Sequence, residues 1–276
     1  MDLFGVKNGK KYKTYEIGRY ISLSSASPYF FEITLNPKTL KQSGILAQIL
    51  DVFRNENIPI LQLKVSTISP EHPIRILIAA DMQGKKKLIE KMVEKMAAVT
   101  GVESIEYSPP LFDGVAVDVW SFPPTFQGQR VVFFRKSLLE GMLKEGWRRM
   151  GEDFAVLLYY AYFHGALETY KNFYGKIGAI KSDKVRLVEE LFRMFGYGIL
   201  NIKTLKENLA VARVYDSFEC KVFKGAKQPR GAIIRGLIAG WIAGYWNAKY
   251  DDIYVREVKC IAKGDPYCEY HIWRRK

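Results

Sequence analysis

The sequence predicts an α+β protein of two domains preceded by a short arm. Segments that alternate with period two and segments with helical spacing follow one another in the order β-α-β-β-α-β over residues 29–108. This is the order of a ferredoxin-like sheet with two helices on one face. Pro109 and Pro110 end that unit, and residues 111–276 form a second series with longer, more apolar helices. The polar residues 1–28 are expected to form an arm or an edge element.

The first domain is expected to contain four strands and two helices. Aromatic and β-branched residues or alternation with period two mark the strands. Apolar residues at helical spacing, Ile45, Ile49 and Phe53, mark the first helix within residues 40–57, and a second helix is expected to begin at Gly84. The expected strands are residues 29–35, 60–68, 74–80 and 102–107.

The segment KQSGILAQILDVFRNENIPILQLKV resembles the start of an ACT domain, in which a small turn ending in glycine leads into an amphipathic helix. The resemblance covers residues 29–108. It implies amino-acid binding at the turn, commonly across a dimer interface, with Ser43, Gly44 and Ile45 as candidate ligand-binding residues. A glycine at a helix N-terminus lets a ligand approach the backbone. The alternative is that Gly44 only eases entry into the helix and that the domain serves dimerisation.

The second domain is expected to combine helices with strands. Residues 129–135 (QRVVFFR) are typical of a strand, and residues 231–249 form the most apolar helix. Further strands are expected at residues 115–120, 198–205 and 209–219 and as two strands at the end of the chain, and further helices at residues 137–150, 154–173 and 184–195.

The most informative pattern lies at the C-terminus, where a glycine-rich helix precedes a strand with Glu-x-x-Cys, a Gly-Asp-Pro turn and Cys-Glu-aromatic. This block is similar to the end of the vinyl-4-reductase domain family, and with the upstream helices the resemblance covers residues 111–276. It implies an α/β sandwich, distantly TRAPP-subunit-like, that holds a small hydrophobic ligand between helices and sheet. The matching residues are Glu257, Cys260, Gly264, Asp265, Pro266 and Cys268.

Gly236, Gly240 and Gly244 are spaced four residues apart in the apolar helix, so they leave one stripe of its surface without side chains. Each costs about 1 kcal/mol relative to alanine, so close packing of a sheet, a second helix or a ligand must recover that loss. Aromatic residues here and in residues 154–173 are able to line a ligand pocket, and the alternative is a plain aromatic core. The candidate ligand-binding residues are Tyr160, Phe163, His164, Gly236, Gly240 and Trp241.

The same resemblance implies a zinc site made of three cysteines and the glutamate of Glu-x-x-Cys. Glu257, Cys260 and Cys268 fit three of the four places. Gly231 stands where the remaining cysteine is expected, and Cys220 is the candidate substitute. These residues would give a tetrahedral ion three thiolates and one carboxylate.

Strand geometry sets a condition on this site. Residues three apart in a regular strand face opposite sides of a sheet, which would separate Glu257 from Cys260. A four-residue loop that pairs Ala262 with Tyr267 would likewise separate Cys260 from Cys268. Zinc binding therefore requires a bulge or a loop of odd length, and the alternative is a set of buried structural thiols.

The sequence contains no P-loop, dinucleotide-binding glycine motif, His-Glu-x-x-His or Gly-x-Ser-x-Gly, so we expect no enzyme. The formal charge of +13 attracts anions, although the basic residues are scattered. The N-terminus lacks an apolar signal region, and the longest apolar stretch, GLIAGWIAGYWNA, is shorter than the roughly 20 residues that span a bilayer. We therefore expect a cytoplasmic protein without membrane insertion.

Together these observations predict a ligand-sensing regulator. Its C-terminal domain would bind a small hydrophobic molecule, and its ACT-like domain would sense an amino acid or mediate dimerisation. A homodimer is expected, since isologous pairing is the usual solution, and the output would pass through a protein partner or DNA. The alternatives are a structural or assembly module without ligand and a basic nucleic-acid-binding transcriptional regulator.

Overall fold

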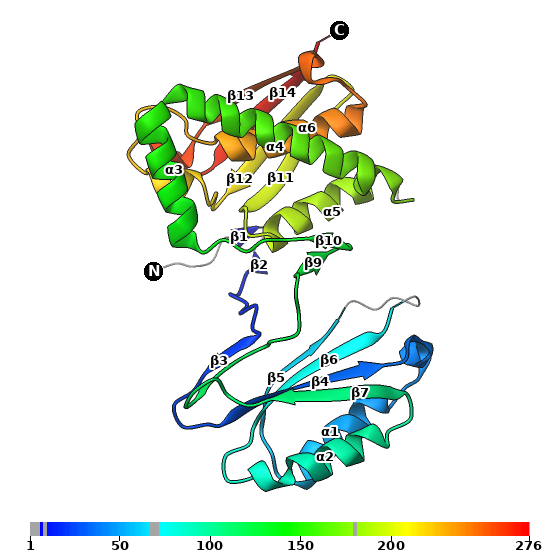
Figure 1. The fold of residues 1–276 in the computed structure, drawn as a ribbon. Coiled ribbons are helices and arrows are strands. Elements are labelled where there is room, and N and C mark those ends of the chain that lie inside the picture. Colours follow the sequence, from blue (N-terminus) through cyan, green and yellow to red (C-terminus); the bar gives the residue numbers. More distant parts are fainter. Residues whose placement is uncertain (1–5, 8–9, 67–71, 179–180, 276) are drawn as a thin grey trace. The chain divides into compact units, whose positions relative to one another are not determined.

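The computed structural model describes residues 6–7, 10–66, 72–178 and 181–275. The chain forms two compact units, Tyr15–Val132 and Met1–Thr14 with Phe133–Lys276 (Figure 1). These units divide the chain at other positions than the limits expected from the sequence, because residues 15–28 and 111–132 belong to the first unit. Both units combine helices with antiparallel sheets, in keeping with the expected α+β class.

The first unit is built around a four-stranded antiparallel sheet with the strand order β5-β6-β4-β7. The 3-10 turns η1 (Pro37–Lys41) and η2 (Lys86–Leu88) precede the two helices, which therefore begin later than expected. Residues 67–68 of the expected strand 60–68 lie outside the described residues. In chain order the elements are β4 (Pro28–Leu35), α1 (Ile45–Asn55), β5 (Ile60–Val65), β6 (Ile74–Asp81), α2 (Ile89–Ala97) and β7 (Val102–Ser108).

Both faces of this sheet are covered. On one face, apolar residues of α1 and α2 such as Ile49 and Met92 pack on Phe31 and form the main core. On the other face, Phe30 packs with residues of the short strands β3 (Tyr20–Ser22) and β8 (Val115–Val117), which pair with each other. The expected strand 115–120 is thus shorter than predicted.

The predicted strand 129–135 is wrong beyond its second residue. Strands β9 (Thr125–Phe126) and β10 (Gln129–Arg130) form a small hairpin. Val132, Phe133 and Phe134 are 64%, 60% and 65% exposed, and no described strand pairs with them. Strand propensity reflects packing on a pleated, half-buried surface, and these residues lack that surface.

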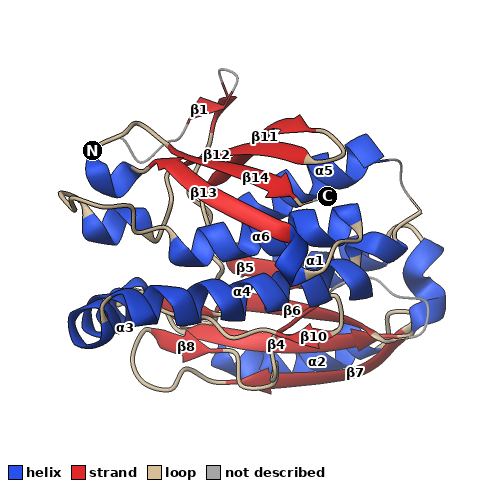
Figure 2. Ribbon diagram, turned by 90° about the horizontal axis from the view of Figure 1, so that it is seen from above, coloured by secondary structure: helices blue, strands red, loops and turns tan. Residues whose placement is uncertain are grey.

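The second unit contains a four-stranded antiparallel sheet with the order β11-β12-β14-β13. Helix α6 lies on one face of this sheet and α4 packs against α6, and both share a single core with the inward side chains of the sheet (Figures 1 and 2). None of the described helices is long and apolar enough to span a bilayer. The elements are β1 (Val6–Lys7), β2 (Lys10–Lys11), α3 (Lys136–Met150), α4 (Glu152–Asn172), η3 (Tyr174–Lys176), α5 (Lys181–Met194), β11 (Ile199–Leu205), β12 (Leu209–Tyr215), η4 (Cys220–Phe223), α6 (Ala232–Trp246), η5 (Tyr250–Asp252), β13 (Ile253–Lys259), η6 (Ile261–Lys263) and β14 (Cys268–Arg274).

The glycine stripe of α6 faces α4. A Cβ atom added to Gly236 would lie 2.5 Å from the carbonyl oxygen of Tyr159, and one added to Gly240 would lie 2.1 Å from that of Phe163. These distances are far below van der Waals contact, so the two helix backbones meet along the stripe. The sequence allowed a sheet, a second helix or a ligand to pack on this stripe, and in the structure a second helix does so.

Candidate metal centre

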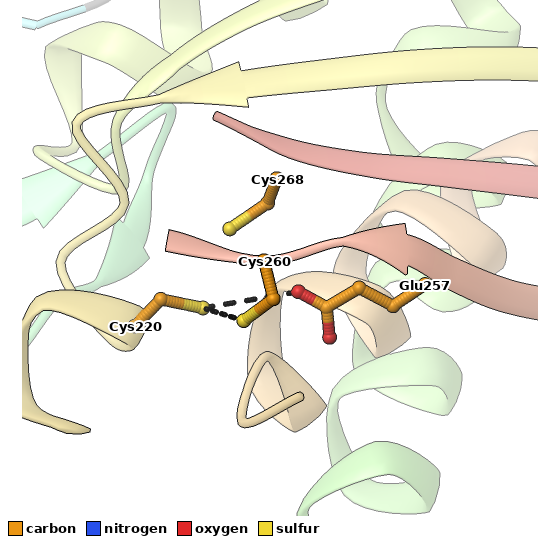
Figure 3. Close-up of side chains that lie close together, drawn as sticks. All are labelled: Cys220, Glu257, Cys260 and Cys268. Carbon is orange, nitrogen blue, oxygen red and sulfur yellow. Dashed lines mark hydrogen bonds between the residues drawn. The ribbon is translucent and has the colours of Figure 1, made fainter. Parts of the chain in front are cut away.

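The four residues expected to bind a metal converge at one buried point in the second unit. Cys220 lies in η4, Glu257 in β13, Cys260 directly after β13, and Cys268 at the start of β14. All four are buried, and one ligand atom from each lies within 4.8 Å of every other (Figure 3). The sulfur and carboxylate atoms point toward one another, so residues up to 48 positions apart in the chain form one donor set.

A bulge in β13 satisfies the geometric condition on this site. Glu257 is opposite Tyr270 in β14, but the next paired residue is Lys259, opposite Glu269. Val258 is therefore an extra residue in β13. Each residue after it faces the side opposite to the one that uninterrupted alternation would give. Glu257 and Cys260 consequently point to the same, inner side of the sheet.

The hairpin that follows also differs from the regular loop considered from the sequence. Ala262 does not pair with Tyr267, because residues 261–263 form the 3-10 turn η6. The Cys260 N–H donates to Asp265 Oδ2 at 2.8 Å, and Gly264 adopts a φ of 102° that favours glycine. This turn brings Cys260 and Cys268 to the same side of the sheet.

Cys220 takes the fourth place from a different element. Its Sγ lies 3.6 Å from Cys260 Sγ. Two thiolates on a tetrahedral zinc ion, each about 2.3 Å from the metal, would be about 3.8 Å apart. At Gly231, an added Cβ would lie 2.4 Å from the hydroxyl of Tyr270 and 2.9 Å from Glu257 Oε1. The space around Gly231 is thus already occupied, and the thiol comes instead from Cys220 in η4.

Hydrogen bonds orient the donor atoms. The Gly231 N–H donates to Glu257 Oε2 at 3.2 Å, and Glu257 Oε1 lies 4.0 Å from Cys220 Sγ. The Ile261 N–H donates to Cys268 Sγ at 3.3 Å. Backbone donors therefore hold one carboxylate oxygen and one sulfur, and they leave Oε1 directed toward the thiols. Donors of this kind orient metal ligands in proteins.

Burial and close neighbours control the protons of this donor set. Burial raises the pKa of Glu257 to about 9, and the charge on Cys260 adds to the effect. Hydrogen bonds from Cys220 and Cys268 lower the pKa of Cys260, and the bond with Cys260 raises the pKa of Cys220. Protons shared among the four groups thus limit their negative charge, and a bound cation would take over that role.

Glu219, next to Cys220, is a buried carboxylate that sequence reasoning missed. Its two oxygens accept hydrogen bonds from the N–H groups of Ile233 and Ile234, at 2.9 and 3.0 Å, in the first turn of α6. Burial raises the pKa of Glu219 to about 8. Glu219 therefore connects the Cys220 turn to the start of the apolar helix. A glutamate 13 residues before a helix carries no spacing signal, so no sequence pattern points to it.

The candidate ligand-binding residues of α4 do not gather around the metal centre. The rings of Tyr160, Phe163 and His164 pack around Tyr250 of η5, with ring centroids 4.8, 4.9 and 5.6 Å from the Tyr250 ring. Phe163 is fully buried, whereas Tyr160 is 41% exposed and His164 is also exposed. These contacts describe an aromatic cluster at one side of α4.

Trp241 lies elsewhere in the core. Its ring contacts Tyr170 and Tyr245, with centroid distances of 5.7 and 5.6 Å. The Trp241 side chain is buried, and its indole N–H has no hydrogen-bond partner among the described residues. Of the six candidates in this unit, Trp241 thus offers a buried donor that is free to bind another molecule.

At the expected amino-acid site of the first unit, Ser43 and Gly44 are exposed and Ile45 is buried. Gly44 precedes α1 with a φ of 90°, and a Cβ added there would meet no atom within 4 Å. The backbone conformation alone therefore accounts for glycine at this position. Amino-acid binding at this turn stays a prediction.

Comparison with known proteins bears on the second unit. Residues 210–274 match the vinyl-4-reductase domain family, and this stretch contains all four donor residues. The phenol-responsive sensory domain of the transcription activator PoxR with phenol is 19% identical, has a TM-score of 0.48, and is aligned over 53% of this chain and 77% of its own.

Two other solved structures are similar over about half of this chain. A vinyl-4-reductase family protein from Methanocaldococcus jannaschii is 14% identical, with a TM-score of 0.32 and coverage of 54% of this chain and 100% of its own. A trafficking protein particle complex subunit 3 from Naegleria fowleri, covalently bound to palmitic acid, is 15% identical, with a TM-score of 0.36 and coverage of 51% and 95%. No curated protein matches the sequence. The family match is confined to residues 210–274, in the C-terminal part of the chain.

Proposed function

We propose that this chain is a ligand-sensing regulatory protein whose C-terminal vinyl-4-reductase domain holds a structural zinc ion and binds a small hydrophobic molecule. The observation that carries the proposal is the convergence of three thiols and one carboxylate in the core of that domain. The family match over the same residues supports it.

The donor set fits zinc. Thiolates and a carboxylate in a buried, four-membered group are the ligands of closed tetrahedral zinc sites, which stabilise folds and leave no position open for substrate. Cys220, Glu257, Cys260 and Cys268 would hold the ion, and its charge would offset part of theirs. A metal here would tie η4 to the β13–β14 hairpin and, through Glu219, to the start of α6. A closed site of this kind has a structural role, so we propose a regulator and not an enzyme.

The Trp241 indole supports small-molecule binding in the same unit. A buried N–H without a partner costs about 1–3 kcal/mol, which a ligand oxygen would recover. Around Trp241 the neighbouring groups are the aromatic rings of Tyr170 and Tyr245. The ligand we infer is therefore an apolar or aromatic molecule with one hydrogen-bond acceptor, lying against α6 at Trp241.

For the first unit we propose the ACT-like role expected from the sequence. The chain order β4-α1-β5-β6-α2-β7 and the strand order β5-β6-β4-β7 are those of a ferredoxin-like sheet. The exposed turn at Ser43 and Gly44 is open to an amino acid, and the alternative role is assembly of a homodimer. A protein partner would transmit the regulatory effect of ligand binding.

Native mass spectrometry of the full chain tests the proposal. We expect one zinc ion per chain, the added mass of a bound organic ligand, and a dimer. Trp241→Phe, which keeps an aromatic ring and removes the N–H, should lose the ligand and keep the zinc. Cys260→Ser should lose the zinc. A chain that takes up no zinc with its thiols reduced, or that carries the same ligand with Phe at position 241, would contradict the corresponding half of the proposal.

A further inference from the structure

The outer face of the C-terminal sheet carries a second ordered set of side chains. Residues alternate along β12 between the core and the outside, and the outward ones are only half-buried. In β14 the outward residues are Glu269, His271 and Trp273. The register places Tyr254 and Arg256 of β13 beside Trp273 and His271 on the same face. Helices α4 and α6 cover only the inner face.

Aromatic rings lie at both ends of this face. Tyr254 and Trp273 are neighbours at one end, with ring centroids 5.5 Å apart, and Tyr254 is 49% exposed. Tyr215 and Tyr267 are neighbours at the other end, with centroids 5.2 Å apart. Large aromatic side chains on an open sheet face provide flat surfaces on which other rings stack.

Positive charge lies between the two aromatic pairs. Arg213 and Lys259 each lie over the ring of Tyr267, at 4.8 and 4.9 Å from its centroid, and Arg256 is exposed on the neighbouring strand. Glu257 and Glu269 are the only carboxylates in the four described strands of this sheet, and Glu257 faces inward. Glu269 is balanced by Arg213 at 2.5 Å, and its Oε1 lies 3.0 Å from His271 Nε2. The outer face is therefore basic.

The distance between the two aromatic pairs matches the length of a short segment of single-stranded nucleic acid. Trp273 lies six positions after Tyr267, which at about 3.4 Å per residue is roughly 20 Å. That length accommodates about three nucleotides, as on other four-stranded sheets that stack two or three bases. An acidic peptide or a lipid headgroup would use the cations and leave the two aromatic pairs without a role. Single-stranded nucleic acid has both the charge and the rings that this face complements.

We propose that the outer face of this sheet binds single-stranded nucleic acid through base stacking and phosphate contacts. The proposal does not rest on zinc or on the small-molecule ligand, which concern the inner face of the sheet. The residues that form the face are Arg213, Tyr215, Tyr254, Arg256, Lys259, Tyr267, His271 and Trp273.

Fluorescence anisotropy of the full chain with labelled oligo(dT) and oligo(U) of about 12 nucleotides tests this assignment. Tyr254→Ala removes an exposed ring and should weaken binding about tenfold. Trp273→Phe, which keeps a ring, should weaken it less than Trp273→Ala. Arg256→Glu should weaken binding and lower the salt slope by about 1. Lys144→Glu makes a matched charge change in α3, outside the sheet, and should have a much smaller effect.

Competition distinguishes this surface from general attraction to a positive protein. Inorganic polyphosphate has the charge of nucleic acid without the bases, so it should displace the oligomer poorly. Three results would overturn the proposal: no binding at low salt, equal losses for Arg256→Glu and Lys144→Glu, or full displacement by polyphosphate with Tyr254→Ala unchanged. Binding only to vesicles of anionic lipid would assign the face to a membrane and would also overturn it.

Discussion

The two units treat buried carboxylates in different ways. In the first unit, buried Glu32 pairs with Arg75, and buried Asp118 pairs with Arg19 at 2.7 Å. In the second unit, buried Glu269 likewise pairs with Arg213 at 2.5 Å, but buried Glu219 and Glu257 form no ion pair with a described residue. The first unit brings a cation of its own to each of these carboxylates, whereas the second leaves Glu219 on the N–H groups of α6 and Glu257 beside three thiols.

This difference shows which unit depends on something from outside the chain. An unpaired buried carboxylate takes up a proton or requires a cation, because burial disfavours its charge. The raised pKa values of Glu219 and Glu257 express the first outcome, and zinc binding would provide the second at Glu257. Glu32 and Asp118 need neither, because arginines of their own unit balance them. The following experiments test this contrast.

The largest effect is expected from removing the metal ligands. Cys260→Ser should abolish zinc binding and destabilise the second unit by several kcal/mol, because metal binding and folding are coupled. Hydrogen exchange followed by mass spectrometry resolves the two units, and protection should fall in α6, β13 and β14 while β4 and β6 stay protected. Val258→Ala, at an exposed neighbouring position, is the control. Full zinc content in the serine variant would contradict the donor assignment.

The next effect concerns the contact between α6 and α4. Gly240→Ala places a methyl group against the Phe163 carbonyl and should cost about 1–3 kcal/mol or more, since neither backbone can move freely. Gly165→Ala is the matched control, because it lies in α4 with no atom within 4 Å of the added Cβ. That change should stabilise the protein by up to about 1 kcal/mol. Chemical denaturation measures both, and equal effects would refute the close helix contact.

A smaller effect, with a defined pH dependence, is expected at Asp118. Burial acts to raise its pKa, but hydrogen bonds from Ser121, the Trp120 N–H and Arg19 outweigh it, so the pKa is lowered from 3.8. The ionised group therefore stabilises the first unit above pH 3.8, and this contribution is lost as pH falls through the lowered pKa. Asp118→Asn should cost about 1–2 kcal/mol at roughly neutral pH. Thermal unfolding should show the difference shrinking below pH 3.8; a constant difference would argue against an ionic role.

The smallest effect is expected at the turn before α1. Gly44→Ala forces alanine into a φ of 90° and should cost about 1 kcal/mol, although the added methyl group meets no other atom. Calorimetry with a panel of amino acids then separates the two roles of this turn. Binding that is present in the native chain and lost in Gly44→Ala supports amino-acid sensing. Equal binding in both chains, or none in the native one, leaves Gly44 with a conformational role alone.

Much of the architecture follows from the sequence because it depends on local periodicity. The elements of residues 28–108 in the first unit and the helices of the second unit occur where apolar spacing places them, within a few residues at each end. Amphipathic segments reveal themselves because one face must be buried. The four donor residues can also be selected from the sequence, since clustered cysteines with a nearby glutamate are typical of a metal site.

The remaining features depend on contacts that spacing does not encode. Residues 129–135 have the composition of a strand, but no described strand pairs with them beyond Arg130. Glu219 caps α6 only because η4 folds back on the helix start. The bulge at Val258 has no sequence signal, and it decides whether Glu257 and Cys260 meet. Tertiary pairing determines each of these outcomes.

The single additional residue in β13 has a consequence for how this chain tolerates change. Because Val258 is the extra residue, Glu257 and Cys260 stand three apart and yet both face the interior, while Lys259 faces the exterior. A substitution at Val258 leaves both placements intact. Deleting it would remove the bulge and restore regular alternation, in which the lysine still faces outward and the thiol inward, so the facing of both residues would survive the loss of this codon.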